Sequence, residues 1–206
     1  MRLSHNQMRL LIILTWELRV ASEAQLASGL GVSLTQLRQL VRRLAKQGLV
    51  TSWRTTMLSL ELHGPLASHV RGSDTPDFAS LAWQLRKRWR QAPRIPARVC
   101  WATSAATQLV GGVGGRLRQP LQLDHDLGVA EIWARRLREP DLNWISEDVF
   151  RNWFLRASRT KVPDALLVAE DRTQIKRVLE YGGQYSAIRL EDFHRYWSSR
   201  APYEIW

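Results

Sequence analysis

The stretch SLTQLRQLVRRLAKQG, residues 33–48, contains the clearest helical pattern in the chain. Ser33 followed three residues later by Gln36 is a capping box, which predicts that a helix begins here, and Gly48 predicts where it ends. At 100° per residue the apolar side chains fall on one face: Leu34, Leu37, Leu40, Val41 and Leu44. The opposite face carries hydroxyl, amide and cationic groups and no carboxylate: Thr35, Arg38, Gln39, Arg42, Arg43 and Lys46. The stretch therefore predicts an amphipathic helix whose outer face suits an anionic partner.

The residues before this helix predict two more. Ser22 and Gln25 form a second capping box, which opens a short helix that stops at the glycines 29 and 31. Apolar side chains recurring every three or four residues predict a first helix over residues 4–19. Two helices joined by a three-residue turn with glycine have the layout of a helix-turn-helix.

The residues after it predict a β-hairpin. Residues 49–53 and 57–62 alternate like two strands, and Arg54-Thr55-Thr56 is expected to form the tip between them. A helix-turn-helix followed by a hairpin is typical of a winged helix, so we assign residues 1–65 to a winged helix-turn-helix domain.

This arrangement favours duplex DNA as the partner. In a helix-turn-helix the second helix enters the major groove, so we expect Thr35, Gln39 and Arg42 to reach base edges. We expect Arg43, Lys46 and Arg54 to contact phosphates. The alternative is a three-helix core with a solvated basic face. We favour DNA binding because the spacing, the carboxylate-free face and the hairpin occur together.

The positive charge is concentrated in the first part of the chain. The net charge of the 206 residues is +11. Residues 1–122 hold 17 basic and 5 acidic side chains, whereas residues 123–206 hold 13 and 14. Four of the 30 cations are lysines, so most of the charge lies on arginine, whose guanidinium fits phosphate. A single cysteine, Cys100, and the lack of a long apolar run favour a cytoplasmic protein without a membrane span.

The middle of the chain, residues 66–96, is expected to be a linker and a basic helix. Residues 63–76 are rich in Gly, Ser and Pro and indicate the linker. The helix that follows, over residues 78–90, has an apolar stripe, and its other face carries Arg86, Lys87, Arg88 and Arg90. It is interpreted as a docked surface helix or as an additional phosphate-contacting helix, with a membrane-surface helix a weaker alternative.

The remainder, residues 97–206, predicts an α/β domain. Its order of helix, three strands, helix and final strand suits a sheet with helices on its faces. The elements are expected at residues 123–137, 142–149, 161–168, 175–181, a helix opening at Ser186, and 203–206.

A Glu on the first of these helices, a Pro-Asp entering one strand and a Glu on the next resemble the PD-(D/E)xK nuclease-like superfamily. The resemblance implies a restriction-endonuclease-like core in which Glu131, Asp164 and Glu180 hold Mg²⁺ for phosphodiester cleavage. The motif also calls for a lysine two residues after Glu180, where this chain has Gly182. The side chains that would substitute for it are Lys176, Gln184 and Arg189. The alternative is that Asp164 and Glu180 are polar groups at strand ends that accept backbone N–H groups.

Residues 97–206 also resemble the replication-relaxation family of plasmid and mobile-element proteins. The similarity rests on QLDHDLGV (122–129), KVPDA (161–165), LEYGGQY (179–185) and the final PYEIW (202–206), and an N-terminal winged helix is expected there too. It implies an α+β protein of two domains that binds double-stranded DNA as an accessory factor in replication, relaxation or mobilisation. Because the motif lysine is missing, we expect a degenerate nuclease domain without a cofactor. A Mg²⁺-dependent nickase and a winged-helix transcriptional regulator are the alternatives, and a homodimer is left open.

Overall fold

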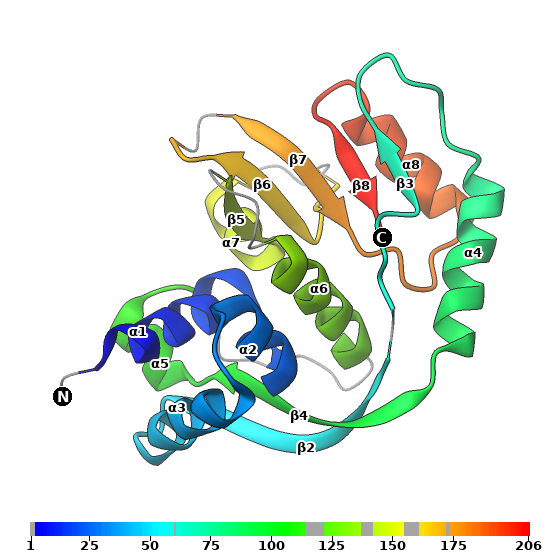
Figure 1. The fold of residues 1–206 in the computed structure, drawn as a ribbon. Helices are drawn as coiled ribbons and strands as arrows, with labels where there is room; N and C mark the ends of the chain where they lie inside the picture. The colour runs from blue at the N-terminus through cyan, green and yellow to red at the C-terminus, as the bar shows by residue number, and fades with distance from the viewer. Residues whose placement is uncertain (1–2, 60, 114–121, 137–141, 155–160, 172–173) are drawn as a thin grey trace. The chain divides into compact units, whose positions relative to one another are not determined.

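The computed structural model describes residues 3–59, 61–113, 122–136, 142–154, 161–171 and 174–206 (Figure 1). The chain is mixed α+β and divides into two compact units, which are described separately. Unit 1 consists of Met1–Met57 and Arg94–Arg138, and unit 2 of Leu58–Pro93 and Glu139–Trp206. Each unit is therefore built from two separate segments of chain.

The helices of unit 1 begin where the serine signals predict. Helix α1 (His5–Ile12) continues into a π-helical turn, η1 (Ile13–Glu17), so the first predicted helix ends about two residues early. Both hydrogen bonds of a capping box are present at Ser22, before α2 (Glu23–Leu30), and at Ser33, before α3 (Leu34–Lys46). Gly31 (φ 65°) and Gly48 (φ 71°) follow these two helices in the left-handed region, which costs glycine little.

Unit 1 also contains a three-stranded sheet in the order β1-β4-β2. The short β1 (Ala21–Ser22) pairs antiparallel with β4 (Arg94–Ala102), with Ala21 opposite Cys100. The backbone N–H of Thr103 donates to Leu49 and that of Ser59 donates to Pro93, so β4 and β2 (Val50–Leu58) run in opposite directions. In Figure 1 these two strands form a long ribbon that curves past α3.

The predicted hairpin is wrong, because its tip, Arg54–Thr56, lies inside β2. The segment offers no Gly, Asn or Pro to form a tight turn, and its β-branched threonines favour extended backbone. The backbone therefore stays extended through this segment. Its partner strand is β4, which follows in the chain after Leu58–Pro93, the first segment of unit 2.

Helices α5 (Ser104–Val110) and α6 (Leu123–Arg136) complete unit 1. Leu123 and Leu127 of α6 pack with Val20 and Val99 in a buried cluster. Gln25 of α2 donates its side-chain amide to the carbonyl of Leu127 (2.8 Å). The helix that was expected to begin the nuclease-like domain therefore belongs to the core of unit 1.

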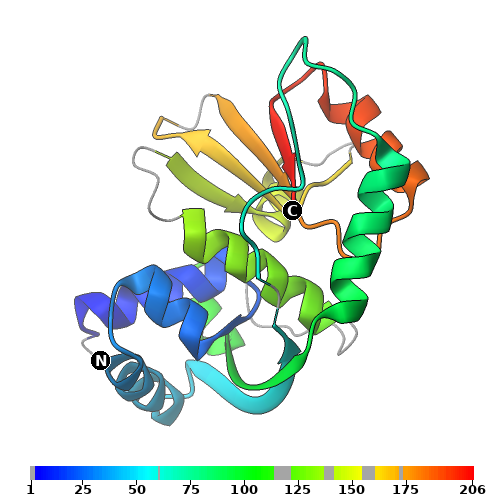
Figure 2. The same ribbon diagram turned by 45° about the vertical axis from the view of Figure 1, so that its right-hand side comes forward.

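Unit 2 is a five-stranded sheet in the order β3-β8-β7-β6-β5. Its central pair, β8 (Tyr203–Ile205) and β7 (Ile175–Glu180), is parallel. The other neighbours are antiparallel, and they complete the sheet with β3 (Ala67–His69), β6 (Ala165–Ala169) and β5 (Leu142–Ser146). Helices α4 (Phe78–Gln91), α7 (Glu147–Phe154) and α8 (Ala187–Trp197) belong to the same unit, and Figure 2 shows α4 beside α8.

Two elements of unit 2 differ from the sequence-based expectation. The predicted linker at 63–76 contains β3, whose His69 is buried at the edge of the sheet. The predicted strand at 142–149 ends at Ser146, whose hydroxyl accepts the backbone N–H of Val149 (3.4 Å) and begins α7. Ser-Glu-Asp is a helix-start signal, which overrides the apolar alternation here.

Candidate functional site

The outer face of α3 is exposed as its pattern predicts. Leu37, Val41 and Leu44 are buried, and Leu40 is half-buried. Leu34 departs from the prediction, because it is exposed at the start of the helix. The side chains expected to face DNA are all exposed: Thr35, Arg38, Gln39, Arg42, Arg43 and Lys46. A solvent-facing stripe of polar and cationic groups therefore runs along the helix.

Arg38 is the member of this stripe that has a fixed ionic partner. Its Nε donates to Oε2 of Glu23 on α2 (2.9 Å). Arg98 on β4 approaches the other oxygen of the same carboxylate, with Nε 3.5 Å from Oε1. The Glu23 side chain is only 6% exposed, so two arginines share one largely buried carboxylate. This cluster orients α2, α3 and β4 and still leaves a net positive charge.

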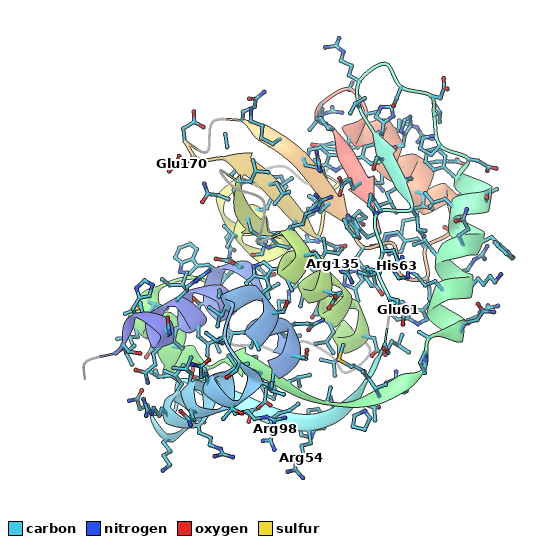
Figure 3. All side chains as sticks on the ribbon, viewed as in Figure 1. Arg54, Glu61, His63, Arg98, Arg135 and Glu170 are labelled. Atoms are coloured by element: carbon cyan, nitrogen blue, oxygen red, sulfur yellow. The ribbon has the colours of Figure 1, made fainter. Side chains whose placement is uncertain are left out.

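A groove of about 600 Å³ lies between α3 and the β2–β4 ribbon. Arg42 and Ala45 line it from α3, Ser52 and Arg54 from β2, and Arg98 from β4. Figure 3 shows Arg54 and Arg98 on neighbouring strands of the ribbon. The ribbon therefore extends the cationic surface of α3.

Four cations of this surface form no ion pair with the described residues: Arg42, Arg43, Lys46 and Arg54. A second hollow beside the groove is lined by Arg42, Arg43, Ala45 and Lys46. Like charges gathered without neutralising carboxylates repel one another, so a polyanion that bound here would relieve the repulsion.

Asp164 and Glu180, the two candidate carboxylates of unit 2, lie at the ends of neighbouring strands. Asp164 precedes β6 and Glu180 ends β7, and these strands are neighbours. Oε2 of Glu180 accepts the backbone N–H of Asp164 (3.3 Å), and Oδ2 of Asp164 accepts the backbone N–H of Tyr181 (2.7 Å). Each carboxylate thus ties its own strand to the next. These hydrogen bonds correspond to the alternative interpretation from the sequence, in which Asp164 and Glu180 are polar groups at strand ends that accept backbone N–H groups.

Glu131 belongs to the other unit. It lies on α6, where its two oxygens accept from Gln25 (3.3 Å) and Arg135 (3.1 Å), both in unit 1. Because the apolar stripe of α6 packs against unit 1, the three carboxylates are not brought together within one unit. Among the residues that the structure describes, no group of three or more His, Cys, Asp and Glu is arranged to hold a metal. Within unit 2, Asp164 and Glu180 supply two of the three carboxylates that the resemblance implies for Mg²⁺, and both accept backbone N–H groups.

Of the three side chains considered as substitutes for the motif lysine, Arg189 contacts Tyr185, a residue beside the pair. Its Nη2 donates to the hydroxyl of Tyr185 (2.7 Å), and its guanidinium lies 3.6 Å from the centre of that ring. Burial raises the pKa of Tyr185, and the adjacent Glu180 and Asp164 carboxylates raise it further. Lys176 lies at the opposite end of β7, where it donates to Gln174, and Gln184 is exposed.

Arg98 and Glu23 were missed by the sequence-based reasoning. Arg98 enters the groove because β4 pairs with β2, a contact between segments far apart in the chain. No local pattern in the sequence identifies the strand with which β4 pairs. Glu23 looked like an ordinary acidic residue in the first turn of a helix.

No helix in the described ranges is long and apolar enough to cross a bilayer. Comparison with known proteins adds no relative, because no family model, no curated protein and no solved structure matches this chain.

Proposed function

We propose that the chain binds duplex DNA through unit 1, with α3 in the major groove and the β2–β4 ribbon against the sugar-phosphate backbone. The observation that carries this proposal is the unneutralised cationic surface formed by Arg42, Arg43 and Lys46 of α3 and Arg54 of β2. Thr35 and Gln39 lie exposed on the same helix and supply the hydroxyl and amide groups that read base edges.

The order of elements in unit 1 supports a winged helix. Three helices lead into two long antiparallel strands, and the short β1 between the first two helices adds to the far side of β4. In this interpretation β2 and β4 are the strands of the wing, and the segment from Leu58 to Pro93 is inserted at its tip.

The salt dependence of duplex binding tests the proposal. Each phosphate that the protein neutralises contributes about −0.9 to the slope of log K against log salt concentration. The three cations assigned to phosphates, Arg43, Lys46 and Arg54, therefore predict a slope of about −3. The double variant Arg42→Ala/Arg43→Ala removes one of these phosphate contacts and one base contact, so it should reduce the slope by about 1 and the affinity by about tenfold to a hundredfold.

A matched control removes the same charge elsewhere. Arg151 on α7 and Arg195 on α8 are exposed helix arginines paired with carboxylates of their own helices. The variant Arg151→Ala/Arg195→Ala has the same net charge as the α3 variant and should bind duplex DNA almost as the wild type does. Equal losses in both variants would reduce the proposal to non-specific attraction by net charge.

For the wider role we propose an accessory factor in the replication, relaxation or mobilisation of a plasmid or mobile element. This rests on the resemblance of KVPDA, LEYGGQY and the terminal PYEIW to the replication-relaxation family. Deleting the gene from its element should change copy number or transfer. A footprint restricted to the gene's own promoter, with copy number and transfer unchanged, would instead favour a transcriptional regulator.

The second candidate function, a Mg²⁺-dependent nickase, is favoured by one observation, the adjacency of Asp164 and Glu180. We expect supercoiled plasmid to remain intact with the purified protein in Mg²⁺ or Mn²⁺, since Glu131 lies in the other unit and Gly182 replaces the lysine. Nicking by the wild type that disappears in Asp164→Asn would replace our proposal with a catalytic one.

A further inference from the structure

Helix α4 presents an outer stripe that the duplex-binding surface does not use. Its inner side, with Phe78, Leu81, Ala82 and Leu85, is buried within unit 2, where the helix packs against α8. The residues at positions i, i+3, i+4 and i+7 of the opposite side are Trp83, Arg86, Lys87 and Arg90. All four are exposed, and the stripe extends for about 10 Å along the helix.

Trp83 is the unusual member of this stripe. Its side chain is 57% exposed, although tryptophan is among the side chains that gain most from burial. Nζ of Lys87 lies 4.8 Å from the centre of its ring, so a cation sits against the indole. An exposed aromatic ring beside a cation is the pairing with which proteins bind unstacked bases.

The charge of the stripe is not neutralised within the protein. Helix α4 contains no Asp or Glu. The carboxylate nearest to it in sequence, that of Asp77, caps the helix by accepting the backbone N–H groups of Ala79 and Ser80. No ion pair joins Arg86, Lys87 or Arg90 to a carboxylate in the described part of the chain. Arg88, by contrast, points inward over the ring of Tyr181, where burial lowers the pKa of its guanidinium.

We propose that the stripe Trp83–Arg86–Lys87–Arg90 binds single-stranded DNA, with Trp83 stacking on an unpaired base and the three cations contacting the adjoining phosphates. A single strand is favoured over a duplex because the faces of paired bases are covered by their neighbours, so an indole cannot stack on them. A membrane is disfavoured because the apolar side of α4 is already buried, which leaves one aromatic residue to insert. The protein would then engage a duplex through unit 1 and an exposed strand through unit 2.

Fluorescence anisotropy with the 206-residue chain tests this proposal. The probes are a labelled single strand of about 20 nucleotides and a blunt duplex of the same length, a size near the single-strand sites of known proteins. Trp83→Ala should weaken single-strand binding about tenfold and leave duplex binding within about twofold, and Trp83→Tyr should restore most of the loss. Arg86→Gln/Lys87→Gln/Arg90→Gln should weaken single-strand binding at least as much and flatten its salt dependence.

Ile188→Ala is the matched control, because Ile188 is another exposed apolar residue (71%) on a helix of the same unit, and it should change neither affinity. Since Trp83 is exposed, its substitution should also leave the thermal unfolding midpoint unchanged. Unaltered single-strand binding in Trp83→Ala would overturn the proposal. So would equal losses on both probes, or a wild-type protein that binds anionic vesicles but not the single strand. Failure of the duplex-binding proposal would register separately, as unchanged duplex affinity in Arg42→Ala/Arg43→Ala.

Discussion

Two polar clusters of this protein have opposite designs. In unit 1, Arg42, Arg43 and Lys46 of α3 and Arg54 of β2 line two neighbouring hollows and form no ion pair with the residues that the structure describes. In unit 2, Asp164 and Glu180 meet at a strand boundary, and each accepts a backbone N–H from the neighbouring strand. Groups left unsatisfied at a surface are available to a ligand, whereas groups satisfied in a core hold the fold together. The comparison predicts that removing the unpaired cations of unit 1 reduces binding and that removing the Asp164 or Glu180 carboxylate of unit 2 reduces stability.

The largest effect is expected from Glu180→Ala. The change leaves the backbone N–H of Asp164 without this acceptor in a partly buried setting, where such a loss costs about 1–3 kcal/mol. Chemical denaturation should show that decrease, while the folded variant binds duplex DNA with wild-type affinity. Glu180→Gln keeps an acceptor oxygen and should lose less. An unchanged stability together with lost DNA binding would reverse the comparison.

Arg54→Ala should have the converse effect. Arg54 lies on β2 beside the groove, and its guanidinium forms no ion pair with the described residues. Losing one phosphate contact should weaken duplex binding about fivefold at low salt and reduce the salt slope by about 1. The unfolding midpoint should not move. Titrations at several salt concentrations measure this slope. A slope in Arg54→Ala equal to that of the wild type would exclude Arg54 from the interface.

Glu23→Gln should strengthen binding. The buried Glu23 carboxylate pairs with Arg38 and Arg98 at the edge of the groove, so neutralising it raises the local positive potential. Duplex affinity at low salt should increase about twofold to threefold, an effect that salt screens. A weaker complex instead would mean that Glu23 acts mainly by holding the two arginines in place.

The smallest effect is expected from Glu17→Gln, and it concerns stability alone. Burial raises the pKa of Glu17, whose Oε2 accepts the indole N–H of Trp133 (2.6 Å). A raised folded-state pKa means that the wild type loses stability as pH rises through that pKa. Gln stays neutral and retains an acceptor, so at pH 7 the unfolding midpoint should be slightly higher than that of the wild type. The gain should vanish near pH 4, and a gain independent of pH would refute this explanation.

Local signals in the sequence located most elements correctly. The capping boxes at Ser22 and Ser33 act within four residues, so the starts of α2 and α3 were predictable without tertiary information. The same holds for α8, which begins after Ser186, and for the apolar stripe of α4. The candidate cations of α3 were found for the same reason, because the period of a helix assigns each side chain to a face.

Pairing across long distances was not predictable in this way. Residues 49–58 were correctly expected to be mostly extended. No local pattern indicated, however, that β2 continues through Arg54–Thr56 and pairs with β4. The residue range of α6 was predicted correctly, but the helix was assigned to the wrong part of the fold. An apolar stripe shows that one face of a helix is buried but does not show which element covers that face. Glu131 therefore belongs to unit 1, whereas Asp164 and Glu180 belong to unit 2.

The sequence by itself therefore determined α2, α3, α4 and α8 and the cationic character of α3, all of which follow from interactions between near neighbours. Only the tertiary structure decided which segments share a unit, that Arg98 joins the groove, and that Asp164 and Glu180 bond to backbone N–H groups. These outcomes depend on which apolar surfaces bury one another, and burial is non-directional, so a pattern of hydrophobic residues does not name its partner.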